Sequence, residues 1–131
     1  MTTHVLPEIA AAEAALQADL RRLQGTWVTT AGRREAEFLV AGRLFTFRFK
    51  DGDVYMGAFW LDTGRRPRAM DMRIDEGPVN HRAKIALCVY ELEEDRLRWC
   101  PTEPGTKDRL DELPTENDPK YLSLVFRRSR P

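Results

Sequence analysis

The sequence has few of the residues that build metal centres and disulfide frameworks. Its 131 residues include only two histidines, His4 and His81, and two cysteines, Cys88 and Cys100. A structural zinc site needs about four converging ligands, and no spacing here supplies them. We interpret His81 as a solvated turn residue, which leaves no strand histidine to bind a haem iron. We therefore predict no metal and no cofactor.

Two cysteines are too few for a disulfide scaffold in a chain of this size. Cys88 and Cys100 fall on strands expected to pair, with the two sulfurs on opposite faces. We therefore predict free thiols, which are typical of a reducing, cytoplasmic compartment.

Long apolar runs and an excess of one charge are also missing. The longest apolar runs are far shorter than the roughly 20 residues that a membrane-spanning helix needs. The amino terminus has no basic stretch followed by an apolar one, so we expect no secretory signal. The 21 basic and 21 acidic side chains cancel. Because no overall field favours an anionic partner, we predict that the protein binds neither nucleic acid nor membrane.

No group of side chains has the composition of a catalytic site. Asp62 and Asp71 fall near predicted strand ends and resemble an acid/base pair only superficially. We expect Asp62 to stabilise its own turn and Asp71 to pair with an arginine such as Arg68 or Arg73. The cysteines have no nearby histidine to act as a base. The sequence thus predicts a protein that is not an enzyme.

One period of hydrophobicity ends and another begins near Gly25. Before Gly25, helical spacing produces a narrow apolar stripe of Ile9, Leu16, Leu20 and Leu23. Pro7 suits the first turn of a helix, and a glycine ends one readily. Residues 1–24 are therefore predicted to be an N-terminal amphipathic helix. Its stripe is expected to cover the body of the domain or, alternatively, to contact a partner protein.

After Gly25 the apolar residues alternate, as they do in strands. We predict strands at residues 26–30, 35–40, 43–50, 54–61, 69–75, 84–92, 96–100 and 121–127, with a long loop at 101–119. Tight turns such as Asp51-Gly52 join most of them. A meander of this kind best removes its exposed edges by closing on itself. The predicted fold is all-β, an eight-stranded antiparallel up-and-down barrel over residues 25–131 with an N-terminal α-helix.

The segment Gly25-Thr26-Trp27 resembles the G-x-W opening of the lipocalin superfamily. In that superfamily the tryptophan plugs one end of the barrel, and a basic residue near the last strand packs across it. The resemblance implies that Trp27 closes the barrel here together with Arg127 or Arg128, and a cation–π contact gives that packing a physical basis.

The chain also resembles an uncharacterised lipocalin-like domain family that is abundant in planctomycete-type bacteria. The family motifs are L-Q-G-x-W, G-x-Y-x-L-D, P-K-x-I-D-L, G-I-Y-E-L…L-x-x-C and R-P-x-E-F. They are matched in this order, the last only in part, by Leu23–Trp27, Gly57–Asp62, Pro67–Met72, Cys88–Cys100 and Arg109–Leu113. The family has no established activity. The resemblance therefore implies a lipocalin-like barrel and names no reaction.

An eight-stranded barrel is either filled by side chains or holds one small ligand. Bulky residues dominate the expected interior, but Gly57 and Cys88 are small, and methionines repack readily around a guest. We predict a non-catalytic binding module for a small apolar ligand. The residues expected to hold it are Phe45, Phe47, Phe59, Met70, Tyr90 and Trp99.

The alternative prediction is a rigid protein-interaction or regulatory subunit. Ile85, Leu87 and Val89 are expected to point outward, and three apolar residues on an outer face need a cover. That cover is expected to be the N-terminal helix, another protein or a second copy of the chain. Leu16 and Leu20 of the helix complete this interaction surface.

Overall fold

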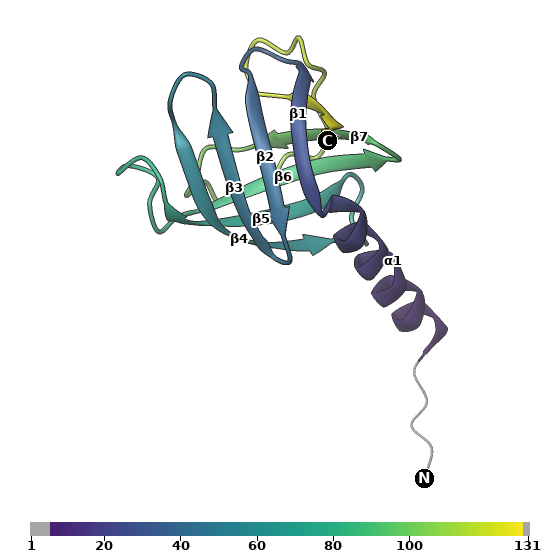
Figure 1. Cartoon of the computed structure of the whole chain (residues 1–131). Coiled ribbons are helices and arrows are strands. Elements are labelled where there is room, and N and C mark those ends of the chain that lie inside the picture. The colour runs from purple at the N-terminus through teal and green to yellow at the C-terminus, as the bar shows by residue number, and fades with distance from the viewer. Residues whose placement is uncertain (1–5, 130–131) are drawn as a thin grey trace.

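The chain forms a closed barrel of eight antiparallel strands with a helix attached at one end (Figure 1). The structure is a computed structural model that describes residues 6–129. The elements are α1 (Pro7–Leu23), β1 (Gly25–Ala31), β2 (Ala36–Ala41), β3 (Leu44–Phe49), β4 (Val54–Asp62), β5 (Arg68–Glu76), β6 (Ile85–Glu93), β7 (Arg96–Pro101) and β8 (Leu124–Arg128). Each strand pairs with the next, and β8 returns to pair with β1. The predicted all-β up-and-down barrel is confirmed.

The strand bounds agree with the predicted ones to within one or two residues, except in the last strand. That strand was predicted to begin at Tyr121, and β8 begins at Leu124. The Asp118 carboxylate accepts hydrogen bonds from the backbone N–H groups of Lys120 and Tyr121, which folds these residues into a turn. A carboxylate that bonds its own backbone in this way competes with strand pairing.

Aromatic residues dominate the interior. Phe45, Phe47 and Phe49 alternate along β3 and are all buried. Phe47 lies 4.6 Å from Trp99 and 5.8 Å from Phe126, measured between ring centroids. These separations fall in the range where aromatic pairs attract one another beyond the burial of their surface. Strands β3, β7 and β8 therefore meet in one aromatic core.

Trp27 closes the barrel at the end where α1 enters. Its side chain is fully buried, and its Nε1 donates a hydrogen bond to the Leu23 carbonyl oxygen at 2.9 Å. The Arg128 guanidinium lies over the indole ring, 4.3 Å from its centroid, and donates to the Gln24 carbonyl oxygen at 2.7 Å. Arg127 is exposed because alternation along β8 turns it outward. Of the two candidate arginines, Arg128 makes the closing contact.

Helix α1 packs into this same end of the barrel through Leu20 and Leu23, which belong to the core or pack against it. Asp19 is buried with them at 1% exposure. Its Oδ2 accepts hydrogen bonds from the Tyr90 hydroxyl at 2.6 Å and from the Arg68 guanidinium at 2.7 Å. The last turns of α1 therefore cover this end of the barrel, whereas Ile9 of the predicted stripe is 57% exposed and the start of the helix projects away from the barrel (Figure 1). The prediction that the whole stripe covers the domain is thus correct only for its C-terminal part. A buried ion pair that the sequence did not predict fixes the position of the helix.

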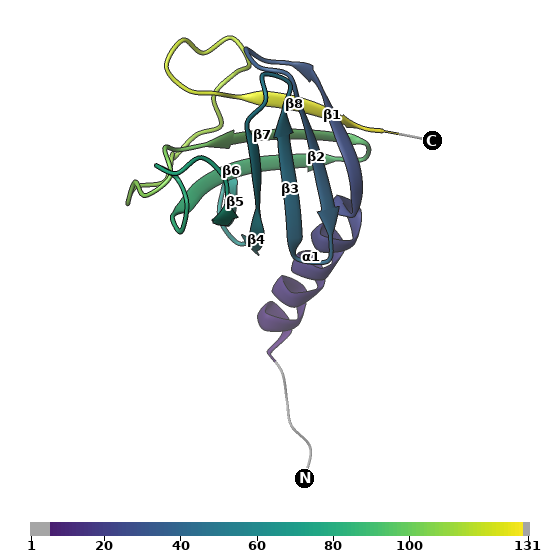
Figure 2. The same cartoon turned by 60° about the vertical axis from the view of Figure 1, so that its left-hand side comes forward.

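The outer face of β6 is covered by the segment between β7 and β8. Val89 is only 1% exposed, whereas Ile85 is 46% exposed. Arg109 donates to the Cys88 carbonyl oxygen at 2.8 Å and pairs with Asp71, which lies opposite Leu87 on the outer face. Figure 2 shows this segment on the side of the barrel away from α1. The prediction that α1 or a partner covers all three residues of this face is wrong.

Cys88 and Cys100 are both buried and free, as predicted. Cys88 points into the core, while Cys100 pairs with Val89 on the outer face. Burial raises the pKa of the Cys88 thiol and raises that of Cys100 to about 12. Both thiols are therefore protonated and unreactive at neutral pH.

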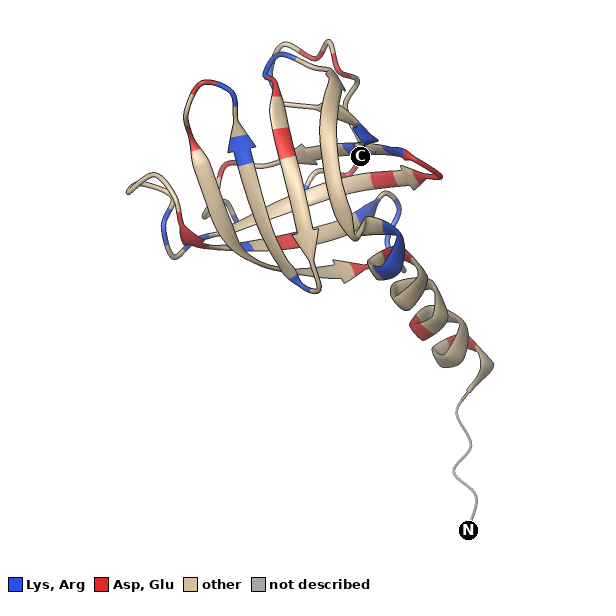
Figure 3. Ribbon diagram, viewed as in Figure 1, with Lys and Arg blue, Asp and Glu red and all other residues tan. Residues whose placement is uncertain are grey.

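Charged residues of both signs are interspersed along the strands and loops (Figure 3). Many form short pairs, within one strand as Arg73 with Asp75 or between two turns as Arg34 with Asp51. Such exposed pairs stabilise a fold by at most about 1 kcal/mol each. The distribution agrees with the net charge of zero.

Candidate functional site

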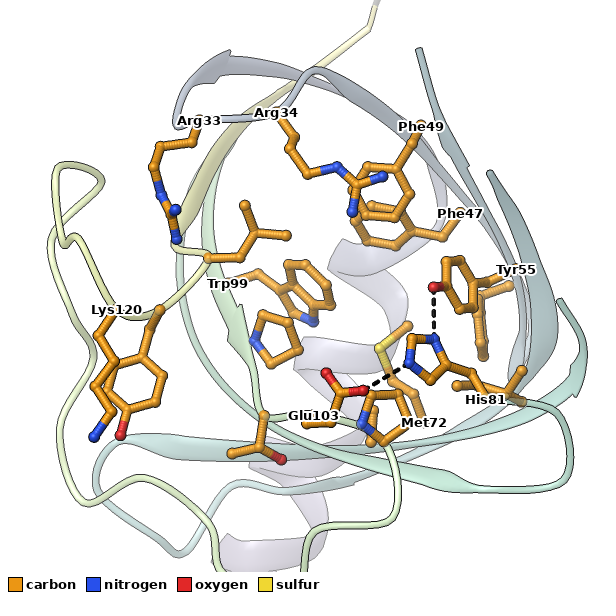
Figure 4. Close-up of a pocket in the computed structure, with 18 residues that line it drawn as sticks. Arg33, Arg34, Phe47, Phe49, Tyr55, Met72, His81, Trp99, Glu103 and Lys120 are labelled. Carbon is orange, nitrogen blue, oxygen red and sulfur yellow. Dashed lines mark hydrogen bonds and ion pairs between the residues drawn. The ribbon is translucent and has the colours of Figure 1, made fainter. Parts of the chain in front are cut away.

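A cavity of about 370 Å³ opens at the end of the barrel opposite α1 (Figure 4). Its wall comes from the inner faces of β3 to β7, because inward-facing side chains alternate along each strand. Its rim comes from the β1–β2 turn, the β5–β6 loop and the segment after β7. The wall residues include Phe45, Phe47, Phe49, Met72, Ala86 and Trp99.

The wall of the cavity is aromatic and rigid. Phe47 stands between Phe49 and Trp99, with ring centroids 4.9 Å and 4.6 Å away. Tyr55 meets Phe49 edge to face at 5.9 Å. Ala86, which is 6% exposed, is the small residue on this wall. The space exists where a small side chain faces a layer of large rings.

A chain of hydrogen bonds crosses one side of the rim. The Tyr55 hydroxyl lies 2.8 Å from Nδ1 of His81, and Nε2 of His81 lies 2.8 Å from Oε1 of Glu103. With the proton on Nε2, His81 donates a hydrogen bond to Glu103, and its Nδ1 accepts one from the Tyr55 hydroxyl. Burial is the main cause that raises the pKa of Tyr55. The chain links β4, the β5–β6 loop and the segment after β7.

His81 is therefore not the solvated turn residue that the sequence predicted. Its side chain is 16% exposed and stacks against Tyr55 at 5.8 Å. Both ring nitrogens already have partners, so the imidazole offers neither a free base nor a free metal ligand to the cavity. Its role at the rim is to hold two loops in place.

Arg34 borders the other side of the rim and is neutralised by its neighbours. Its Nη2 lies 2.6 Å from Oδ2 of Asp51 and 3.3 Å from Oδ2 of Asp53. The guanidinium also stacks on Phe49 at 3.7 Å from the ring centroid. These contacts tie the β1–β2 turn to the β3–β4 hairpin and make Arg34 part of the wall.

Three of the six predicted ligand-binding residues line the cavity, namely Phe45, Phe47 and Trp99. Phe59, Met70 and Tyr90 are at most 1% exposed and do not line it. They also point inward, but the Tyr90 hydroxyl contacts Asp19, where α1 fills the barrel. Alternation gives the face on which a residue lies and contains no information on its depth along the barrel axis. These three residues therefore lie outside the cavity.

The sequence analysis did not assign Phe49, Tyr55, Met72 or His81 to the site. Phe49 and Met72 carried the same inward-facing signal as the assigned residues. Tyr55 and His81 had no usable signal, because a loop brings the histidine to the rim and the two residues are far apart in sequence.

The carboxylates that resembled an acid/base pair are both engaged in structural contacts. Oδ1 of Asp62 accepts a hydrogen bond from the Gly64 backbone at 3.0 Å and so stabilises its turn, as predicted. Asp71 pairs with Arg109 and with neither of the arginines expected to partner it. Among residues 6–129 no group of three or more His, Cys, Asp or Glu side chains is placed to hold a metal ion. No helix in this range has the length and apolar character to cross a membrane.

Comparisons with known proteins found no match to a family model, a curated protein or a solved structure. The resemblance to the lipocalin-like family therefore stays a prediction that rests on the motifs. The candidate site is defined by its own geometry.

Proposed function

We propose that the protein is a non-catalytic binding module that holds a small apolar molecule in the open end of its barrel. The observation that carries the proposal is the cavity of about 370 Å³ with its aromatic wall. Ligand sites in proteins usually measure about 300–1,000 Å³ and combine an apolar wall with a few polar groups. This cavity lies at the lower end of that range, which favours a small ligand.

The side chains around the cavity support binding over catalysis. His81 has both nitrogens engaged, and the wall holds no carboxylate that is free to act as a base. The two thiols have raised pKa values and lie in packed surroundings. A nucleophile needs an adjacent base and access to substrate, and neither thiol combines them.

The alternative function as a protein-interaction subunit loses much of its expected surface. Leu20 packs against the core, and Val89 is covered by the chain itself. Leu16 and Leu87 are half-buried, so that Ile85 and Ile9 of the helix stripe are the members of the predicted surface that stay exposed. The cavity is therefore the better-supported site.

The proposal is tested with N-phenyl-1-naphthylamine, an uncharged probe whose fluorescence rises in apolar surroundings. We expect saturable binding of one probe per chain. The variant Ala86→Phe places a ring in the cavity and should abolish this binding. Ile85→Phe is the matched control, because it adds a ring on the outer face of the same strand and should leave binding unchanged.

Two results would overturn the proposal. One is the absence of saturable binding to the wild-type chain. The other is undiminished binding to Ala86→Phe, provided that near-ultraviolet circular dichroism shows a native fold in both variants. Either result would mean that the probe does not enter the barrel.

A further inference from the structure

The polar side chains around the cavity that lack a hydrogen-bond partner are mainly donors. Among the described lining residues they are Arg33, Trp99, Lys120 and Tyr121. Arginine, tryptophan and lysine side chains can only donate, while the tyrosine hydroxyl can donate or accept. Among the other polar lining groups, the Tyr55 hydroxyl, His81 and one Glu103 oxygen bond one another, and the Thr102 hydroxyl donates to the Leu87 carbonyl oxygen. A ligand that pairs with the unpartnered donors must bring acceptors.

Two of these donors are cations at the rim. Arg33 and Lys120 are both exposed, and neither forms an ion pair with a described residue. The Lys120 ammonium lies 5.2 Å from the Tyr121 ring centroid, a contact that leaves its N–H donors unused. Figure 4 shows both side chains on the same side of the opening. An anionic group at the mouth would therefore find positive charge without having to lose its contact with water.

The carboxylates nearest to these cations are engaged elsewhere. Glu103 binds His81, and Asp118 accepts hydrogen bonds from the backbone N–H groups of Lys120 and Tyr121. The pKa of Asp118 is lowered mainly by its hydrogen bonds from the Tyr121 and Lys120 backbone and less by the charges of Arg33 and Lys120, neither of which forms an ion pair with it. The donors of Arg33 and Lys120 thus remain available at the rim.

Trp99 places a further donor in the wall. Its side chain is 4% exposed, and its Nε1–H is buried without a hydrogen-bond partner. The acceptor beside the indole is the Cys88 thiol, and a thiol is at most a weak hydrogen-bond acceptor. Buried N–H groups without a partner are rare in native structures and call for an explanation. An acceptor on the ligand body would supply the missing partner.

We propose that the ligand class is a small aromatic carboxylate, with its ring system against the wall formed by Phe47, Phe49 and Trp99 and its carboxylate at Arg33 and Lys120. This inference rests on the proposed binding function and specifies its ligand. Flat rings match a wall built of offset and edge-to-face aromatic contacts. The ligand's carboxylate supplies the negative charge and the hydrogen-bond acceptors that these donors lack. It also stays at the open rim, where desolvation costs least.

The test uses three naphthalene compounds of nearly the same shape as competitors for N-phenyl-1-naphthylamine. They are 2-naphthoate, 2-acetylnaphthalene and 2-isopropylnaphthalene, whose substituents carry two, one and no oxygen atoms. We expect 2-naphthoate to bind more tightly than 2-acetylnaphthalene at low ionic strength. Because salt screens exposed charges, 1 M sodium chloride should reduce only the affinity of 2-naphthoate.

Rim variants locate the carboxylate. Arg33→Gln and Lys120→Gln should each weaken 2-naphthoate binding by about two- to fivefold, the effect of one exposed charge pair. Neither variant should change the affinity for 2-isopropylnaphthalene. Arg65→Gln is the matched control, because it removes an exposed arginine from the β4–β5 loop at the opposite end of the barrel and should change neither affinity.

The outcomes separate the two proposals. Equal affinity of 2-naphthoate in the wild type, Arg33→Gln and Lys120→Gln would overturn the carboxylate inference while leaving the binding function in place. Tighter binding of 2-acetylnaphthalene than of 2-naphthoate would do the same. Failure of all three compounds and of N-phenyl-1-naphthylamine would overturn the binding function itself.

Discussion

The ion pair between α1 and the barrel allows a quantitative prediction for Arg68→Met. Asp19 is 1% exposed, and its described side-chain partners are Arg68 and Tyr90. Removing one partner of a buried ion pair usually costs 3–5 kcal/mol, because the other charge stays buried without compensation. The Arg68 side chain is 30% exposed, so water partly reaches the gap that it leaves. We therefore expect a loss of about 3 kcal/mol, the low end of that range.

Two further variants separate the charge effect from lost packing. Tyr90→Phe removes a hydrogen bond to the carboxylate but keeps the arginine, and should cost about 1.5–2 kcal/mol. The double variant Asp19→Ala with Arg68→Met leaves no buried charge. It should therefore be more stable than Arg68→Met alone, although it lacks one more side chain.

The assay is equilibrium unfolding in urea, followed by tryptophan fluorescence and by circular dichroism of the helix. Arg65→Met serves as the control, since Arg65 is exposed and its substitution should change the free energy of unfolding by no more than about 0.5 kcal/mol. If Arg68→Met matches this control, the reasoning is refuted. It is equally refuted if the double variant is less stable than Arg68→Met.

The same cluster predicts a pH dependence. Burial, followed by the hydrogen bond to Asp19, raises the pKa of the Tyr90 hydroxyl above its usual 10. In the unfolded chain this tyrosine ionises near pH 10, whereas in the folded barrel it stays protonated. Its contribution to stability is therefore complete below pH 10 and is lost as pH rises beyond it. Unfolding free energies between pH 8 and pH 11 should fall less steeply for Tyr90→Phe than for the wild type.

Three other predictions concern the barrel itself. Cys88 and Cys100 should not react with Ellman's reagent at pH 8 in the native protein, whereas both should react in guanidinium. Fast reaction of either thiol in the native protein would contradict their burial. Gly57→Ala should lower the free energy of unfolding in urea by at least about 3 kcal/mol, because the added Cβ would lie 1.8 Å from a β5 carbonyl oxygen. A smaller loss would disprove this close approach. Arg128→Lys should lower the melting temperature, because lysine cannot keep the hydrogen bonds and the cation–π contact of the guanidinium. An equal decrease for Arg127→Lys would contradict the role of Arg128 in closing the barrel.

The change of hydrophobic period at Gly25 was enough to predict the helix and the barrel, whereas the closed end was predicted from the resemblance of Gly25-Thr26-Trp27 to a G-x-W motif. Burial of alternating residues decides which face each strand turns inward, so Phe45, Phe47 and Trp99 were placed correctly. Gly57 was expected to leave room inside the barrel. The structure gives a different reason for the glycine, because the β5 backbone approaches too closely for any side chain.

The rim could not be predicted, because loops and not strand periodicity assemble it. The contact between Tyr55 and His81 joins residues 26 positions apart, and that between His81 and Glu103 joins residues 22 apart. The same holds for Arg109, whose pairing with Asp71 across 38 positions fixes the segment that covers β6. Each contact depends on a loop path that hydrophobic periodicity does not specify.

The position of the cavity follows from an asymmetry along the barrel axis. At one end, the large buried side chains of Trp27, Phe59 and Tyr90 form one cluster with Leu20 and Leu23 of α1. At the other end no helix enters, and Ala86 faces the ring of Phe47 across the interior. Packed interiors close over gaps wherever a side chain can reach them, so a persistent cavity needs rigid walls. The aromatic contacts of Phe47 supply that rigidity, which is why the open end, rather than the tryptophan-closed end, is the place to look for a ligand.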